Sequence, residues 1–336
     1  MTHEFSLVFL GSSGAGLQLT QGLESKGTFS LLILNQRIQL TPKSARIQTI
    51  FVPKHSIIYV LFYLISCPLI IRKLKVIPFG GKVLFPMINP YDFNFFLMLT
   101  LLRRDLSSYV VVHDALPHKG SFWPPRLVTR YILKRATKII TLSDYTSQAL
   151  RTKYKFNGEI DKVEHPVLFD IKLRNVKTEL PDRYVVSIGR VRRYKGIDEF
   201  LKLYKRLPES DVKMLVAGSG RISHNYRKLG VSTINRWLTD SEFVEIIRNS
   251  EAVLLTYTEA SQSGVIPIAM ALNKKILFRD SGGLSEQLLG YPNAYEYTQD
   301  NFENVWKMML TTETNVENRA TDSWSSFLNC LGFQNE

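Results

Sequence analysis

Cysteine is almost absent from this sequence: among 336 residues only Cys67 and Cys330 are cysteines. Two cysteines so far apart exclude a disulfide framework and favour a reducing compartment, and no Cys or His spacing is typical of a metal site. The apolar run at 5–11 also lacks the preceding basic segment of a signal peptide, so we expect it to be a buried strand. These absences predict a cytoplasmic protein that needs no metal.

Acidic residues are scarce in the first half of the chain. Residues 1–172 hold 22 Lys and Arg but 10 Asp and Glu, whereas the remainder holds 21 and 20, within a net charge of +13. This asymmetry indicates an anionic partner for the first half, a membrane surface or a nucleic acid, unless it is only a solvated basic face. Tyr and Phe lie in apolar runs typical of a core, so nucleic acid is not the expected partner.

One apolar run is almost as long as a membrane-spanning segment. Residues 55–75 are apolar for about sixteen positions and end in Arg72, Lys73 and Lys75. A spanning helix needs about 20 apolar residues, and Pro68 interrupts the run. We expect a buried or interfacial helix with a basic end, which is either a core helix of an α/β domain or a membrane contact.

Apolar strand-like runs alternate with helix-like runs along the whole chain. The alternation predicts parallel sheets covered by helices, which is an α/β fold. A polar stretch at 163–183 interrupts it, and the alternation then begins again. We therefore predict two Rossmann-like, doubly wound domains, at 1–170 and 171–305, followed at 306–336 by C-terminal helices that could cross back to the first domain.

A glycine-rich turn follows the first predicted strand, with Gly11, Gly14 and Gly16. Its spacing differs from the G-x-G-x-x-G dinucleotide fingerprint, and no acidic residue follows the second strand to hold a ribose, so a nicotinamide enzyme is not supported. The turn either lets a ligand approach the backbone or allows tight packing of strand against helix.

A basic turn follows the first strand of the second predicted domain. The stretch SIGRVRRYKGIDEF, Ser187–Phe200, places Arg190, Arg192, Arg193 and Lys195 between an apolar strand and a helix. In open α/β sheets ligands bind at the carboxyl ends of the strands. Helix N-termini favour anions, and added Arg and Lys point to a phosphate.

A second block completes the predicted anion site. VAGSG supplies Gly218 after the next strand, and in 257–288 Ser261, Ser263 and Gly264 directly precede a helical run. Free backbone N–H groups are expected at such a helix start. A diphosphate held between the basic turn and this helix start is the expected ligand.

These stretches resemble the family 4 retaining glycosyltransferases. SIGRVRRYKGIDEFL is similar to the family's G-R-x-x-x-x-K-G stretch, and EASQSGVIPIAMALNKKILFRDSGGLSEQL resembles its donor-site block. VVVHDALPHKG, RATKIITLSDYTSQALRTKY and KVEHPV extend the resemblance over most of the chain. It implies a GT-B architecture, in which two Rossmann-like domains face each other across a cleft. The C-terminal domain would bind the nucleotide-sugar donor and the N-terminal domain the acceptor, with no cofactor and no metal.

The resemblance also implies roles for individual residues. Arg190 and Lys195 would bind and neutralise the diphosphate, His113 would lie beside the donor sugar, and Asp114 and His118 are candidates for acceptor contact. Arg192 and Arg193 would face solvent or the other domain. The implied donor-binding residues are Gly14, Gly16, Gly218, Glu259, Ser261, Ser263 and Gly264.

The sequence departs from the family in its paired glutamates. Alignment places Ile268 at the second glutamate position and Ala260, beside Glu259, near the first. Since isoleucine accepts no hydrogen bond from a ribose hydroxyl, Glu259 alone, or Ser261 and Ser263, are expected to replace the pair.

The sequence therefore predicts a retaining hexosyltransferase that is cytoplasmic and peripheral on the inner face of the cytoplasmic membrane. Its donor would be a nucleoside-diphosphate hexose or N-acetylhexosamine, and its acceptor a lipid-linked glycan, on polyprenyl diphosphate, of bacterial surface polysaccharide such as lipopolysaccharide O-antigen, capsule or exopolysaccharide. Its partners would be the nucleotide sugar, this acceptor and an anionic membrane. A nucleotide-sugar epimerase on the same fold and a non-catalytic binding protein are the alternatives.

Overall fold

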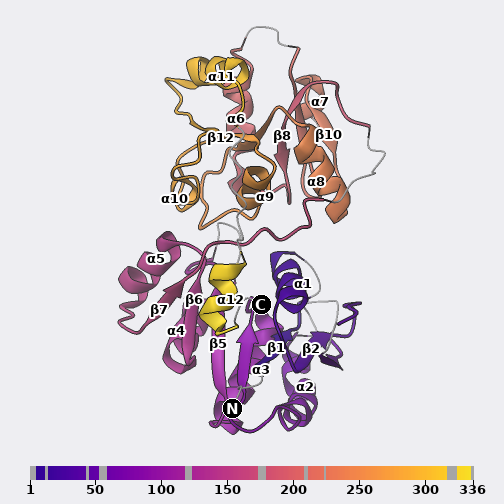
Figure 1. Ribbon diagram of the computed structural model, residues 1–336, viewed down its shortest axis with the longest axis vertical. Coiled ribbons are helices and arrows are strands. Elements are labelled where there is room, and N and C mark those ends of the chain that lie inside the picture. Colours follow the sequence, from indigo (N-terminus) through magenta and orange to yellow (C-terminus); the bar gives the residue numbers. More distant parts are fainter. Residues whose placement is uncertain are drawn as a thin grey trace. The chain divides into compact units, whose positions relative to one another are not determined.

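The protein is described by a computed structural model that covers residues 5–11, 14–42, 45–52, 59–117, 123–172, 179–207, 211–222, 225–315 and 324–333. It divides into two compact units (Figure 1). The first unit comprises Met1–Glu164 and Ser323–Glu336, and the second comprises His165–Asp322. Each unit has a parallel sheet packed against helices, so the predicted α/β fold with two Rossmann-like domains is confirmed.

The first unit is built on a parallel sheet in which, among the described residues, seven strands follow the order β3-β2-β1-β4-β5-β6-β7. The central strands are short apolar runs that are buried on both faces, as parallel strands between helices must be. The strands are β1 (Phe5–Phe9), β2 (Leu31–Asn35), β3 (Arg46–Ile50), β4 (Lys82–Phe85), β5 (Ser107–Val112), β6 (Lys138–Thr141) and β7 (Ile160–Lys162).

Helices of the first unit cover this sheet. Four of them contribute buried side chains to one core cluster with the strands, namely α2 (Tyr59–Leu74), α3 (Pro90–Leu102), α4 (Arg126–Arg135) and α5 (Asp144–Tyr154). The start of α3 is fixed by a capping box between Asn89 and Asp92. The Asp92 carboxylate also accepts a hydrogen bond of 2.5 Å from the Leu10 N–H, which ties this helix start to the end of β1.

The second unit repeats this plan with six strands, within its described part, in the order β10-β9-β8-β11-β12-β13. The strands are β8 (Tyr184–Ile188), β9 (Lys213–Ala217), β10 (Ser232–Ile234), β11 (Ala252–Leu255), β12 (Lys275–Phe278) and β13 (Ala294–Glu296). The helices are η2 (Arg193–Lys195, a 3-10 turn), α6 (Ile197–Tyr204), α7 (Asn225–Lys228), α8 (Asp240–Asn249), α9 (Val265–Ala271), α10 (Leu284–Gln287) and α11 (Phe302–Thr311).

Helix α2 corrects one expectation. The sequence suggested that Pro68 interrupts the apolar run, whereas the helix continues through this proline. Pro68 is exposed, while Ile70 and Leu74 beyond it are buried in the core. Their burial offsets the hydrogen bond that a proline removes from a helix interior. Residues 55–58 of the run lie outside the described residues.

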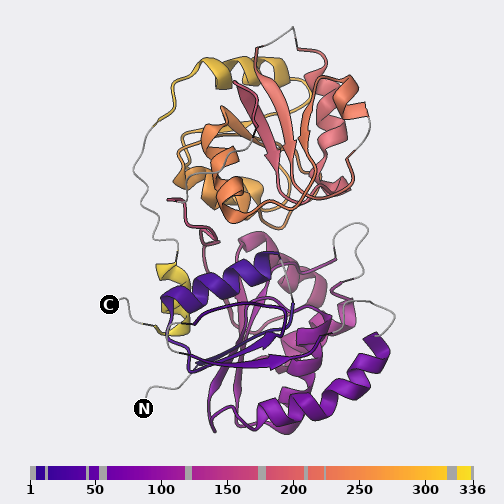
Figure 2. The same cartoon turned by 90° about the vertical axis from the view of Figure 1, so that its right-hand side faces the viewer.

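The end of the chain packs onto the first unit. Helix α12 (Ser325–Leu331) lies beside α1 (Ala15–Lys26) in Figure 2. The contact depends on a glycine, since a Cβ at Gly22 would lie 2.2 Å from Cζ2 of Trp324. Trp324 and Phe327 are buried, and the backbone oxygen of Cys330 accepts a 3.0 Å hydrogen bond from Lys138.

We expect Trp324→Ala to destabilise the first unit by about 3 to 5 kcal/mol, because it leaves a large cavity against α1. Hydrogen exchange followed by mass spectrometry would report this as faster exchange in peptides of β1, β2 and α1. The matched control is Trp237→Ala, since Trp237 is 56% exposed in the second unit. Unchanged exchange in the first unit would show that α12 contributes nothing to its stability.

Candidate functional site

The basic turn of the second unit is fixed by backbone contacts to the segment that follows β11. Thr256 donates through Oγ1 to the backbone oxygen of Lys195 at 2.5 Å, and the Thr258 N–H donates to that of Tyr194 at 2.8 Å. The next residue, Gly196, has a φ of 65°, and a Cβ there would lie 2.1 Å from the Thr256 backbone oxygen. Only glycine fits this close approach.

Lys195 is the centre of the site. Its side chain is buried, its Nζ donates a hydrogen bond to the Tyr257 hydroxyl, and this Nζ lies 4.1 Å from the centroid of the Tyr257 ring. Among the described residues no carboxylate forms an ion pair with it. Burial, with a smaller contribution from the charge of Arg190, lowers the pKa of Lys195 to about 8. A buried cation with no carboxylate partner among the described residues is a candidate for binding an anion.

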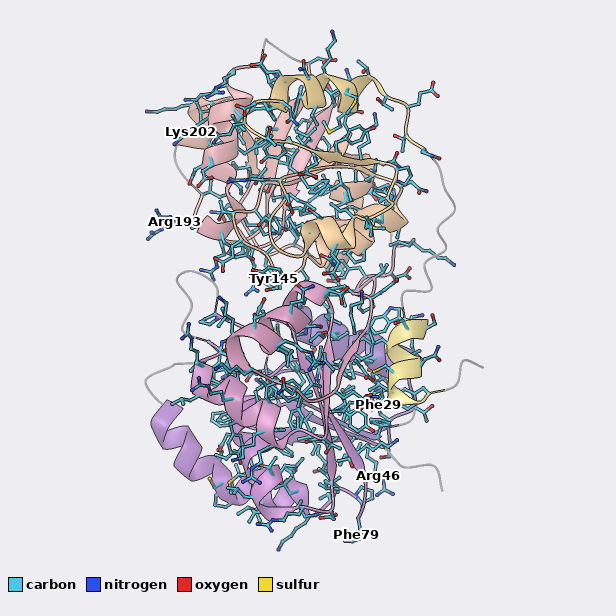
Figure 3. The ribbon with its side chains drawn as sticks, turned by 90° about the vertical axis from the view of Figure 1, so that its left-hand side faces the viewer. Phe29, Arg46, Phe79, Tyr145, Arg193 and Lys202 are labelled. Carbon is cyan, nitrogen blue, oxygen red and sulfur yellow. The ribbon has the colours of Figure 1, made fainter. Side chains whose placement is uncertain are left out.

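The other cations of the turn are exposed. Arg190 follows Gly189 directly, lies near enough to Lys195 to affect its pKa, and forms no ion pair with a described residue. Arg192 and Arg193 are also exposed, and Figure 3 shows the Arg193 side chain projecting away from the second unit. The turn therefore offers one buried cation, Lys195, and the exposed Arg190 near it, at the end of β8.

Two glycines lie at the strand ends, and one of them, Gly189, is close to the Lys195 ammonium group. Gly189 and Gly218 follow β8 and β9, and have φ angles of 107° and 132°. A Cβ at Gly218 would lie 2.1 Å from the Gly189 oxygen, and one at Gly189 would lie 3.6 Å from Nζ of Lys195. The carboxyl ends of the two strands therefore meet at Lys195, where parallel sheets bind ligands.

The loop between β11 and α9 carries the residues predicted to contact a donor. Glu259 is half-buried, and its Oε2 is a buried oxygen that has no hydrogen-bond partner among the described residues. Such an oxygen costs free energy unless a donor reaches it, so a hydroxyl group of a ligand would satisfy it. Ser261 and Gly264 are half-buried in the same loop, and a Cβ at Gly264 would lie 3.4 Å from Cε1 of His165.

Ser263 is held in a network that the sequence did not reveal. Its N–H donates to Oε1 of Gln287 at 2.7 Å, so the expectation of a free N–H group at this position is wrong. Its Oγ lies 3.1 Å from the Tyr257 hydroxyl and accepts from the Val265 N–H at 3.4 Å. Ser263 thus links the start of α9 to the hydroxyl that accepts a hydrogen bond from Lys195.

Tyr257 is the functional residue that sequence reasoning missed. It is buried, and burial raises the pKa of its hydroxyl to about 12, so the hydroxyl is neutral and can accept from Lys195. Its ring packs edge-on against Tyr194 of the basic turn, with a centroid separation of 6.0 Å. The available signal was its position at the end of an apolar strand, next to the donor-site block.

The position that aligns with the second glutamate belongs to the core. Ile268 lies in α9, is 1% exposed and packs with the strands of the second unit. Its side chain is therefore committed to packing and offers nothing to a ligand. Of the predicted replacements, Glu259 has the unsatisfied oxygen described above.

The predicted residues of the first unit lie at the carboxyl end of β5 and in the loop that follows. His113 is buried, and its Nε2 lies 2.9 Å from the Pro86 oxygen. Burial lowers the pKa of His113, so its imidazole is neutral at pH 7. Asp114 follows it and is half-buried. The prediction for His118 falls outside the described residues.

The glycine-rich turn also lies in the first unit. Gly14 has a φ of 81° and immediately precedes α1. Gly16 is buried, and a Cβ there would lie 2.5 Å from the Phe9 ring and 3.0 Å from Cβ of Met87. Close packing of α1 on β1 therefore accounts for Gly16, whereas Gly14 has open space around it.

Among the described residues no group of three or more His, Cys, Asp or Glu side chains could hold a metal ion. The part of the chain that the structure describes also contains no helix with the length and apolar character needed to cross a bilayer.

Comparison with known families finds a match within the second unit. Residues 170–307 match the family described as glycosyl transferases group 1. An uncharacterized glycosyltransferase of Haemophilus influenzae is 25% identical over 225 residues, which are 63% of this chain. The chain spans 62% of the length of that curated relative.

Solved structures with the same fold cover both units. HepE of Anabaena, in complex with UDP and glucose, has a TM-score of 0.68 and 14% identity over 97% of this chain and 95% of that one. The lipopolysaccharide glycosyltransferase WaaG has a TM-score of 0.60 and 13% identity, covering 92% and 90%. A UDP-N-acetylglucosamine 2-epimerase has a TM-score of 0.61 and 14% identity, covering 100% and 98%. Residues 170–307 are therefore similar to the glycosyl transferases group 1 family, and the chain has the GT-B fold of these solved structures.

Proposed function

We propose that this protein is a retaining glycosyltransferase that moves a hexose or N-acetylhexosamine from a nucleoside diphosphate to a lipid-linked glycan. The observation that carries the proposal is Lys195, a buried cation that has no carboxylate partner among the described residues. It lies within residues 170–307, which match a glycosyltransferase family. A departing diphosphate is the anion that such an enzyme must stabilise.

The roles of the two cations follow from their surroundings. Lys195 is fixed by Tyr257, so its charge is oriented before a ligand arrives, whereas Arg190 is exposed and would close on the bound diphosphate. During transfer the bond between the anomeric carbon and the diphosphate oxygen breaks, and a bond from the acceptor oxygen to that carbon forms on the same face. The acceptor proton passes to the departing diphosphate. We expect this to need no cofactor and no metal.

Other residues would then orient the substrates. The unsatisfied Oε2 of Glu259 suits a hydroxyl group of the sugar or ribose, and Gly218 and Ser263 lie in the loops that meet around Lys195. His113, with a lowered pKa, would act as a neutral hydrogen-bonding group toward the sugar, and Asp114 as a contact for the acceptor.

The biological setting is part of the proposal. WaaG takes part in lipopolysaccharide biosynthesis, and the first half of this chain is basic, as suits an acceptor held at an anionic membrane. We therefore propose a cytoplasmic enzyme, peripheral on the inner membrane face, that acts in surface polysaccharide assembly.

Titration calorimetry with UDP, GDP, dTDP and ADP in the presence of EDTA tests the donor site. HepE was solved with UDP and glucose, so UDP is the first ligand to titrate. Micromolar affinity for one nucleotide, about 8 kcal/mol of binding free energy, supports a metal-free donor site. Absence of binding by all four would contradict the proposal.

An epimerase is the competing function, since a UDP-N-acetylglucosamine 2-epimerase shares the fold. An epimerase converts its sugar nucleotide without an acceptor. Incubation of the protein with the sugar nucleotide alone, followed by anion-exchange chromatography, separates the two functions. A new sugar nucleotide would favour the epimerase, whereas sugar transfer that requires a lipid-linked acceptor favours the transferase.

We predict that Lys195→Ala and Arg190→Ala each lower kcat/KM by roughly 100-fold or more, comparable to the loss of one donor aimed at developing charge. Steady-state assays of sugar transfer, or of slow donor hydrolysis, provide the measurement. Arg192→Ala is the matched control, because Arg192 is an exposed cation of the same turn. Near-normal kinetics in the first two variants would refute the assigned roles.

A second prediction concerns pH. Lys195 binds a diphosphate only when protonated, and its pKa is about 8, so kcat/KM should fall as pH rises through about 8. Tyr257→Phe removes a hydrogen bond that favours the charged ammonium, so the fall should move to lower pH and kcat/KM should drop about tenfold.

Lys195→Arg is the control for this profile, because arginine stays charged throughout the range and should abolish the alkaline fall. A change that affects only stability would lower activity at every pH without moving the profile. An unshifted profile in Tyr257→Phe would therefore show that the hydroxyl does not position Lys195.

A further inference from the structure

Five exposed apolar side chains of the first unit belong to the C-terminal parts of α2 and α3 and to the turn after α2, and we call them the patch. Of eleven large hydrophobic side chains that are exposed among the described residues, five belong to this patch. Phe79 is 89% exposed, and the other four are between 43% and 52% exposed. The patch consists of Leu69, Val76, Phe79, Leu101 and Leu102.

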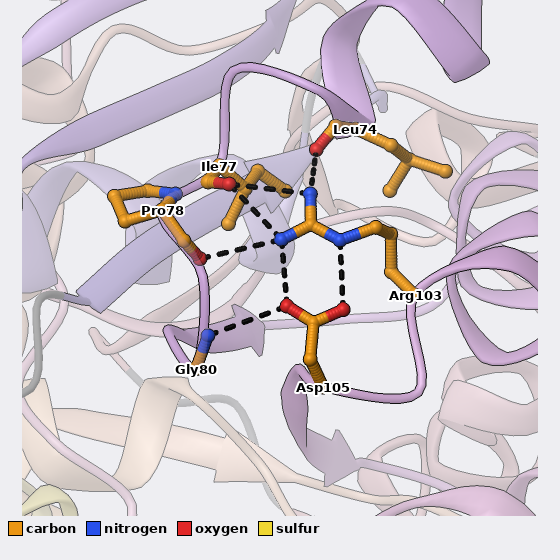
Figure 4. A network of polar contacts seen from close by, with 6 residues as sticks. All are labelled: Leu74, Ile77, Pro78, Gly80, Arg103 and Asp105. Atoms are coloured by element: carbon orange, nitrogen blue, oxygen red, sulfur yellow. Dashed lines mark hydrogen bonds and ion pairs between the residues drawn. The ribbon is translucent and has the colours of Figure 1, made fainter.

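The patch is held in place by Arg103 (Figure 4). The Arg103 guanidinium donates to the backbone oxygens of Leu74 at 2.5 Å and of Ile77 at 3.2 Å, and forms a two-point ion pair with Asp105 at 2.7 and 2.8 Å. The Gly80 N–H donates to the same carboxylate at 3.3 Å. These bonds fix the turn that carries Phe79 against the end of α3. The exposed ring is therefore presented by an ordered turn, and Figure 3 shows it at the edge of the unit.

The charges around the patch have one sign. Arg72, Lys75 and Arg104 are exposed beside the apolar side chains. The two acidic residues of 59–105 are Asp92, which is fully buried as a helix cap, and Asp105, which is paired with Arg103. The face is thus apolar and cationic, with no free carboxylate among its described residues.

Single exposed hydrophobic residues are ordinary on protein surfaces, but a cluster of them marks an interaction site. A set of exposed apolar side chains with Lys and Arg around it fits the interface of an anionic bilayer. The apolar side chains enter the headgroup region, and the cations contact phosphate. A protein partner for such a face would have to be acidic and apolar at once. The charge pattern therefore favours a lipid surface.

We propose that this face, with Phe79 at its centre, is where the protein binds an anionic membrane surface. The patch lies at the turns that lead into the amino ends of β4 and β5, so this contact is separate from the acceptor residues at the carboxyl end of β5 and does not depend on sugar transfer. The proposal also narrows the contact that the sequence suggested. Ser66 and Ile70 of the apolar run are buried, and of its described apolar side chains Pro68 and Leu69 are exposed. The contact is therefore formed by the basic end of the run, with Leu69, and by the turn that follows it.

Flotation of the full chain with phosphatidylcholine vesicles, with and without phosphatidylglycerol, tests the proposal. We expect binding to the anionic vesicles that weakens with added salt. Phe79→Ser should weaken the partition coefficient about tenfold, in line with the loss of one buried aromatic ring. Arg72→Glu together with Lys75→Glu should weaken it by more, since each cation near the surface contributes about fivefold.

Matched controls are available in the second unit. Leu289 is 83% exposed and Lys202 is an exposed cation, so Leu289→Ser and Lys202→Glu change the same kinds of side chain elsewhere and should bind vesicles normally. In Phe79→Trp the tryptophan emission should shift to the blue when anionic vesicles are added, whereas in Leu289→Trp the emission from position 289 should not.

Other outcomes would overturn the proposal. Equal vesicle binding by Phe79→Ser and wild type would place the membrane contact elsewhere, and a dimer that Phe79→Ser dissociates would assign the patch to a second copy of the chain. The donor site is tested separately, because UDP titration of the same variants reports the second unit. Failure of vesicle binding with intact UDP binding would refute the patch alone, and the reverse would refute the transferase alone.

Discussion

The second unit is arranged around one constraint, a lysine ammonium that is buried and has no carboxylate partner within the described part of the unit. Its burial costs free energy, which is why the pKa of Lys195 falls to about 8. The Tyr257 hydroxyl and ring offset part of this cost. That arrangement requires the basic turn and the end of β11 to lie within hydrogen-bonding distance, and Gly196 is the residue that permits it. An anionic ligand would recover the remaining cost, so the free site is less stable than a carboxylate-paired lysine but ready to bind.

The predictable part of the fold is the part with a strong apolar pattern. Central strands such as β1, β2 and β8 are fully buried five-residue runs, so their composition alone identified them. Strands near the edges of the sheets were harder to predict from the sequence. β3 reads RIQTI and is mostly exposed or half-buried, and β7 and β10 are three residues long. Such segments become strands because a neighbour offers a hydrogen-bonding edge, and this information is not present locally in the sequence.

The candidate site shows the same division. Arg190 and Lys195 were predictable because a basic turn between an apolar strand and a helix has one usual place in an α/β sheet. The difference in burial between Arg190 and Lys195 was not predictable, since it depends on Tyr257, which is 62 positions away from Lys195. The contact from Ser263 to Gln287 likewise joins loops 24 positions apart. Pairings of this kind are decided by packing, so a list of residue types yields the members of a site but not the bonds between them.

The charges of the two units differ in number and in exposure to solvent. In the second unit acids and bases are nearly balanced, and the important cation is a single buried one, whose strength comes from exclusion of water. In the first unit the helices α2 and α4 and the turns after α2 and α3 present Arg72, Lys75, Arg104, Arg126, Arg130 and Lys134 to solvent. Exposed charges act weakly one by one and are screened by salt, so they are useful only against an extended surface. A buried ammonium suits a small ligand that can be desolvated, whereas a dispersed basic face with exposed apolar side chains suits a membrane. The cations of the chain thus act in two different ways, as one buried charge in the second unit and as many exposed charges in the first.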